Sequence, residues 1–80
     1  IDASKIQIRD YRDVLSDVVL PQGMTMNDAA KALNEIAESW RNGGLTTKAD
    51  VMNEIHVQLN VDGEKLAEIT DRVLGKNYAD

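Results

Sequence analysis

The stretch "WRNGGLTTKADVMNEI" (Trp40–Ile55) ends one helix and starts another within a few residues. Gly43 or Gly44 can adopt the left-handed backbone that closes a helix. Thr46 or Thr47 can then cap the next helix by accepting a hydrogen bond from its first turn. Connections this short favour neighbours that pack against each other. The stretch therefore predicts two adjacent helices joined by a tight turn.

The residues before this joint, "TMNDAAKALNEIAESW", form the clearest helical pattern of the chain. Thr25 can cap, and Asp28 stands at the position where an acidic side chain reaches back to the cap. One apolar stripe follows, made of Ala29, Leu33, Ile36, Ala37 and Trp40. Because the stripe is one-sided, the helix must bury it against other elements.

Two further helices are predicted after the joint. The first has the buried stripe Val51, Met52, Ile55 and Leu59, with Leu45 placed to pack onto its first turn. The second is capped by Asp62 and carries the stripe Leu66, Ile69, Val73 and Leu74. Gly75 ends it.

The N-terminal segment "SKIQIRDYRDVLSDVVL" (Ser4–Leu20) fits two interpretations. A helical stripe runs through Ile8, Tyr11, Leu15 and Val18, widened by Val14 and Val19. The alternation in "KIQIRDY" also permits a short strand over Lys5–Arg9. We favour a helix from about Asp10 and leave Ser4–Arg9 open. Pro21 and Gly23 are expected to end this first element.

These patterns predict an all-α fold, a small bundle of three to four short helices, with a short extended N-terminal segment as the open alternative. The chain has 80 residues, enough for one domain spanning residues 1–80 with a thin core. It begins at Ile1 without a Met, and we expect it to be an excised fragment of a longer chain.

Composition narrows the function. There is no cysteine, and the net charge is −5 with both signs interspersed, so no basic stretch is available for nucleic acid. The longest apolar run, Val18–Leu20, is far shorter than the roughly 20 residues of a membrane span. We therefore expect a cytoplasmic protein that contacts neither membrane nor specific nucleic acid.

Catalytic chemistry has little support in the sequence. His56 is the only histidine, and no cysteine or second histidine can share a metal with it. "QLNVDGEKLAEI" resembles a calcium loop, but its first and twelfth positions are Gln58 and Ile69 instead of acids. No phosphate-binding glycine loop is present. We predict no catalytic, cofactor-binding or metal-binding residue, and no enzyme activity.

The candidate site is instead an interface. Trp40 is either a core anchor or an interface anchor, because Trp is enriched at binding hot spots. Tyr11, Met24 and Met26 are placed to extend such a patch around the Pro21–Gly23 turn. The predicted partner is another protein or a second copy of the chain, with no cofactor.

"KIQIRDY", the turn at Pro21 and "AAKALNEIAESWRNGGLTTKADVMNEI" together resemble the C-terminal part of tailed-bacteriophage portal proteins. The family has an extended segment, an Ala-rich helix, a Gly-Leu/Ile-Ser/Thr joint, a helix, an Asp-containing turn and an acidic last helix. The matching positions are Ala29, Ala30, Gly44, Leu45, Thr46 and Asp62. The resemblance covers Ile6–Ile69. It implies a non-enzymatic ring in the virion through which DNA passes during packaging, with this segment in its helical crown.

The alternative function is a helix-turn-helix DNA-binding regulator. "IHVQLNVDGEKLAEITDRVL" places a tight turn between a short helix and a second one. The second helix would enter the major groove. Its outward residues are Glu64, Lys65, Glu68, Asp71 and Arg72. This face is mostly acidic, and phosphates would repel it.

Overall fold

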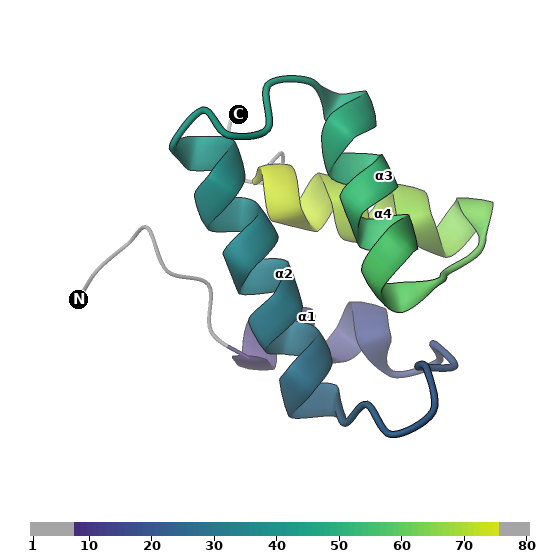
Figure 1. Cartoon of the computed structure of the whole chain (residues 1–80). Helices are drawn as coiled ribbons and strands as arrows, with labels where there is room; N and C mark the ends of the chain where they lie inside the picture. The colour runs from purple at the N-terminus through teal and green to yellow at the C-terminus, as the bar shows by residue number, and fades with distance from the viewer. Residues whose placement is uncertain (1–7, 76–80) are drawn as a thin grey trace.

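The structure is a computed structural model that describes residues 8–75, which form four α-helices and no strand (Figure 1). The helices are α1 (Ile8–Leu15), α2 (Met26–Arg41), α3 (Lys48–Leu59) and α4 (Gly63–Leu74). In Figure 1, α4 crosses behind α3, and α1 lies behind the first turns of α2. The prediction of a small all-α bundle is confirmed.

The four helices share one core. Both α2 and α4 pack against all three other helices, whereas α1 and α3 do not touch each other within residues 8–75. The core side chains are Tyr11, Val14, Leu15, Ala29, Ala30, Leu33, Ile36, Ala37, Val51, Ile55, Leu59, Val61, Ile69 and Val73. Each helix thus buries one stripe, as the apolar periodicities predict, but Met52, a predicted member of the α3 stripe, is only half-buried and lies outside this core.

The ends of α2 are closed by local hydrogen bonds. Thr25 Oγ1 accepts from the backbone N–H of Asp28, and the Asp28 carboxylate accepts from the backbone N–H of Thr25, both at 3.1 Å. Gly43 has a φ of 85° after the last turn, and the Gly44 N–H donates to the Ser39 carbonyl at 2.8 Å. The predicted cap and stop are both confirmed.

The starts of α3 and α4 follow the same rule. Between the two threonines at the joint, the structure selects Thr47, whose hydroxyl accepts from the Asp50 N–H at 3.0 Å. Asp62 caps α4. Asn60 has a φ of 53°, a left-handed conformation that Asn tolerates and that reverses the chain between α3 and α4. Gly75 ends α4 with a φ of 74°.

The first element differs from its prediction at both ends. Helix α1 begins at Ile8, earlier than the predicted start near Asp10. Ile8 and Arg9 are therefore helical, which excludes a strand at these two positions. The remaining open positions, 4–7, lie outside the described residues.

The end of α1 is Leu15, well before Pro21, so the expectation that Pro21 ends this helix is wrong. Ser16 Oγ donates to the Asp13 carbonyl at 3.0 Å, and the Val18 N–H donates to the Leu15 carbonyl at 3.1 Å. A Ser hydroxyl that bonds the preceding turn competes with helix continuation.

The Pro21–Gly23 segment has a role of its own. The Met24 N–H donates to the Pro21 carbonyl at 3.0 Å, and Gly23 has a φ of 86° at the third position of this turn. A type II β-turn requires a positive φ at that position. Pro21 and Gly23 thus build the turn that delivers the chain to the Thr25 cap.

The early end of α1 changes the environment of two valines. Val18 is partly buried and packs against the core. Val19, which the helical stripe placed inside, is 90% exposed. Its predicted burial is wrong because the helix that would have turned it inward stops at Leu15.

Candidate functional site

The four predicted interface residues do not gather in one place. Tyr11 is fully buried and contributes no surface. Met24, Met26 and Trp40 are partly buried and pack against the core. Met26 starts α2 and Trp40 lies in its last turn, so a rise of 1.5 Å per residue separates them by about 21 Å. The structure therefore does not bring Trp40 together with the two methionines.

A different surface of the described chain is concave. An open groove of about 430 Å³ lies between the segment after α1 and the α3–α4 turn with the first half of α4. We call it the Val19 groove. Its apolar lining comes from Val18, Val19 and Val61. Its charged lining comes from Asp17, Asp62, Glu64, Lys65 and Glu68, so carboxylates outnumber the single ammonium group.

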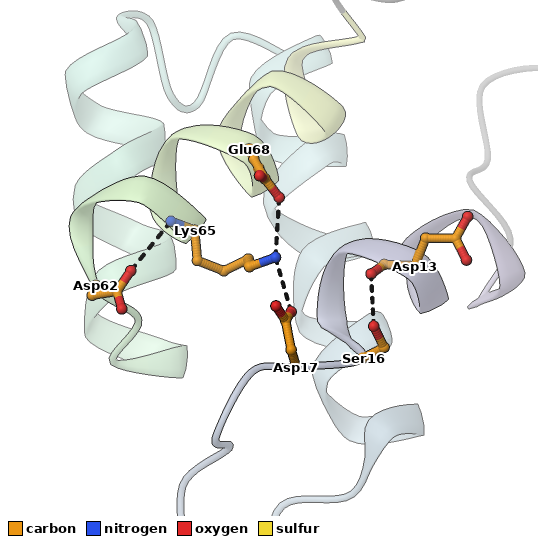
Figure 2. A network of polar contacts seen from close by, with 6 residues as sticks. All are labelled: Asp13, Ser16, Asp17, Asp62, Lys65 and Glu68. Atoms are coloured by element: carbon orange, nitrogen blue, oxygen red, sulfur yellow. Dashed lines mark hydrogen bonds and ion pairs between the residues drawn. The ribbon is translucent and has the colours of Figure 1, made fainter.

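Lys65 ties the two walls of the groove together (Figure 2). Its Nζ lies 2.8 Å from Asp17 Oδ1 and 3.1 Å from Glu68 Oε2. Asp17 belongs to the segment after α1, whereas Lys65 and Glu68 lie on α4. The Lys65 side chain is only 20% exposed, so its stem is largely covered while its ammonium group meets both acids.

This ion-pair cluster shifts the pKa values of its members. The hydrogen bond from Lys65 is the largest cause that holds the pKa of Asp17 below its usual value. The same contact with Asp17, followed by that with Glu68, raises the pKa of Lys65. Both changes favour the charged forms, so the groove keeps its ionic walls at neutral pH.

The α3–α4 turn lines the groove opposite the segment after α1. Val61 is buried in the core, and its carbonyl oxygen lies 3.2 Å from His56 Nδ1. Asp62 Oδ1 accepts from the backbone N–H of Lys65 at 3.2 Å. The turn is therefore held from both of its helices. His56 serves this turn as a structural partner and is exposed.

The acids of the groove that pair with Lys65 are exposed to solvent. Within residues 8–75, no three His, Asp or Glu side chains are arranged to hold a metal ion. Asp17 and Glu68 are 70% and 62% exposed, whereas general acid–base chemistry uses carboxyls desolvated in a cleft.

None of the helices in the described range is long and apolar enough to cross a bilayer.

No protein-family model, no curated protein and no solved structure matches this chain.

Sequence reasoning missed the groove because it placed Val19 in a buried stripe. One signal could have found it. Ser16 and Asp17 are residues that bond their own backbone and favour turns over helix interiors. They stand directly before the β-branched pair Val18–Val19, which has a lower helix propensity than Leu or Ala. Reading these residues together would have ended α1 before Val18.

Proposed function

We propose that this domain is a non-catalytic protein–protein interaction module that works as a piece of a larger assembly. The observation that carries the proposal is Val19, an apolar side chain 90% exposed on the wall of a groove. A single exposed valine is ordinary on a protein surface. Val19 stands out because it lines an open groove together with Val18 and Val61, so a partner side chain that enters the groove meets an apolar contact there.

A protein partner fits this groove better than a small substrate. The groove is open, and its acids are either exposed or already engaged as a helix cap or ion pair. Such a surface offers contact area and charge, with no desolvated group to transfer a proton. We therefore propose no enzyme activity. In this proposal the partner is another protein or a second copy of the chain.

The narrower form of the proposal assigns the domain to the crown of a tailed-phage portal ring. Its support is the resemblance over Ile6–Ile69, together with the way Gly44, Leu45 and Thr46 connect α2 to α3 in the described structure. Ala29 and Ala30, two further matching positions, are buried on α2. The domain would then act in the virion, and otherwise in the cytoplasm.

The alternative function, helix-turn-helix DNA binding, is favoured by the three-residue connection between α3 and α4. Charge argues against it. Lys65, one of the cations of α4, is engaged by Asp17 and Glu68, and Glu64 is exposed on the same helix. Phosphates brought to this face would meet mostly carboxylates.

Sedimentation equilibrium and DNA titration test the proposal. The domain should self-associate with rising concentration or bind its parent chain, and it should not shift the anisotropy of a labelled duplex at physiological salt. A protein that stays monomeric and binds duplex DNA with a steep salt dependence would overturn the proposal. For the portal form, the parent reading frame should place several hundred residues before Ile1, and a Met directly before Ile1 would contradict it.

A further inference from the structure

We propose that the Val19 groove binds a cationic segment of a different protein, and that an apolar side chain of that segment covers Val19. This inference rests on the proposed function, and it names the chemistry of the partner. It is carried by two independent properties of the same surface, an uncovered apolar wall and a negative rim.

The apolar wall supplies the contact. Val19 is 90% exposed, Val18 beside it is partly buried, and Val61 opposite is almost fully buried. Exposure thus falls from the edge of the groove to its floor. A partner side chain that enters along this gradient removes Val19 from water while it rests on side chains that the core already holds in place.

The rim supplies the charge preference. Lys65, the only cation that the described residues contribute to the groove, already has two acidic partners, Asp17 and Glu68. Glu64 is exposed and has no hydrogen-bond or ion-pair partner among residues 8–75. The field at the rim is therefore negative, and it attracts Lys or Arg side chains while it repels acidic segments.

The same charge argument selects a different protein over a second copy. The chain carries a net charge of −5. Its exposed cations on α2 and α3 are separated: Lys31 and Arg41 lie more than two helical turns apart on α2, and Lys48 is paired with Asp71. Arg72 and Lys65 are engaged as well, so the cations whose side chains the structure describes form no compact basic face that could meet the rim of a neighbouring copy.

Fluorescence anisotropy with a designed probe tests the inference. The probe is a fluorescein-labelled amphipathic peptide of alternating Leu and Lys pairs, titrated with the folded domain. Two reference peptides replace every Lys by Glu or every Leu by Ser. The Leu–Lys peptide should bind, with an affinity that falls as salt rises, and both reference peptides should bind at least about tenfold more weakly.

A pair of valine variants locates the site. Val19→Asp should weaken the Leu–Lys peptide by about tenfold, although it adds a negative charge that favours a cationic peptide. Val57→Asp is the matched control, because Val57 is the other large hydrophobic residue that is exposed among those the structure describes, 66% exposed on α3 and outside the groove. It should leave the Kd within about twofold. Helical circular dichroism confirms that both variants fold.

A second pair tests the rim. Glu64→Gln should weaken binding by about twofold to fivefold, whereas Glu38→Gln, on the exposed face of α2, should not. Amide chemical-shift changes in the unmutated domain should centre on residues 17–19 and 60–68. This measurement keeps the test valid even if one variant folds poorly.

Several outcomes would overturn the inference. One is equal binding of the Leu–Lys and Leu–Glu peptides, and another is equal loss in Val19→Asp and Val57→Asp. If Val19→Asp abolishes self-association, the groove is occupied by a second copy and the cationic partner is wrong. If the peptide fails to bind while the domain still self-associates or binds its parent chain, the groove assignment falls and the interaction module stands.

Discussion

Helix α2 and the segment that leads into it, residues 16–25, are held in place by different kinds of contact. In α2, the cap of Thr25 and Asp28, the stop at Gly43 and a continuous buried stripe all act within the helix or directly below it. Residues 16–25 form no helix. They depend on turn hydrogen bonds, on partly buried side chains such as Val18, and on the ion pair with Lys65 of α4. Contacts local in sequence define the first region, and contacts distant in sequence define the second.

The largest expected effect tests the buried stripe of α2. Leu33 is fully buried, so Leu33→Ala should lower the free energy of unfolding by about 2–5 kcal/mol. Lys31→Ala on the exposed side of the same helix should change it by less than about 0.5 kcal/mol. Urea unfolding at neutral pH measures both. A change below about 0.5 kcal/mol for Leu33→Ala would mean that Leu33 does not face the core.

The next effect tests whether a helix cap that is local in sequence stabilises the start of α3. Thr47→Ala removes the hydroxyl that accepts from the Asp50 N–H, and it should cost about 1 kcal/mol. Thr46→Ala, at the adjacent exposed position, should cost less than about 0.5 kcal/mol. The same unfolding assay distinguishes them. Equal losses would show that the two threonines share the cap.

This contrast explains how far the sequence predicts the fold. The Thr25, Thr47 and Asp62 caps are each recognised within three residues, because a cap side chain bonds the backbone of the first turn that follows it. The sequence left Thr46 and Thr47 equivalent, since both stand within reach of the helix start. Only the backbone geometry of the folded chain shows that Thr47 is the residue that caps α3.

The groove could not be predicted in the same way. It forms only when Val19 and Val61, which are distant in sequence, are brought to one surface. The apolar periodicity predicted that the α1 stripe continues to Val19. Periodicity alone contains no information about the Ser16 hydrogen bond or the Asp17–Lys65 ion pair, which are present where the helix has already ended. The aromatic Tyr11 was an interface candidate by residue type, and its full burial depends on how α1 packs between α2 and α4.

A smaller effect tests the acid side of the α2 cap. The backbone N–H of Thr25 is the largest cause that lowers the pKa of Asp28 in the folded protein. A carboxyl whose folded pKa lies below its unfolded value of about 3.9 stabilises the fold above that pH, and the contribution is lost as pH falls through the folded pKa. Asp28→Asn should therefore lose stability at neutral pH and show a weaker further loss below about pH 4. Identical acid unfolding curves for both proteins would contradict this role.

The smallest expected effect tests the long-range tie of residues 16–25. The pKa of Asp17 is lowered and that of Lys65 is raised by their contact. The Asp17 contribution is lost as pH falls below about 4, and the Lys65 contribution is lost as pH rises above about 10.4, so the pair stabilises the fold between these limits. Asp17→Asn should make the free energy of unfolding less dependent on pH at both the acidic and the alkaline limit. Added salt should mimic the change, because the pair is exposed to solvent on the Asp17 side.

Hydrogen exchange separates this tie from global stability. In Asp17→Asn, the Val18 amide, which donates to the Leu15 carbonyl, should exchange faster, while the amides of α2 keep their protection. Asp13→Asn is the control, because it removes a nearby carboxylate charge, in the last turn of α1, while the Asp13 backbone carbonyl still accepts from Ser16. Faster exchange in both variants would assign the effect to net charge. Faster exchange in Asp17→Asn alone would show that one contact with α4 holds the segment that carries Val19.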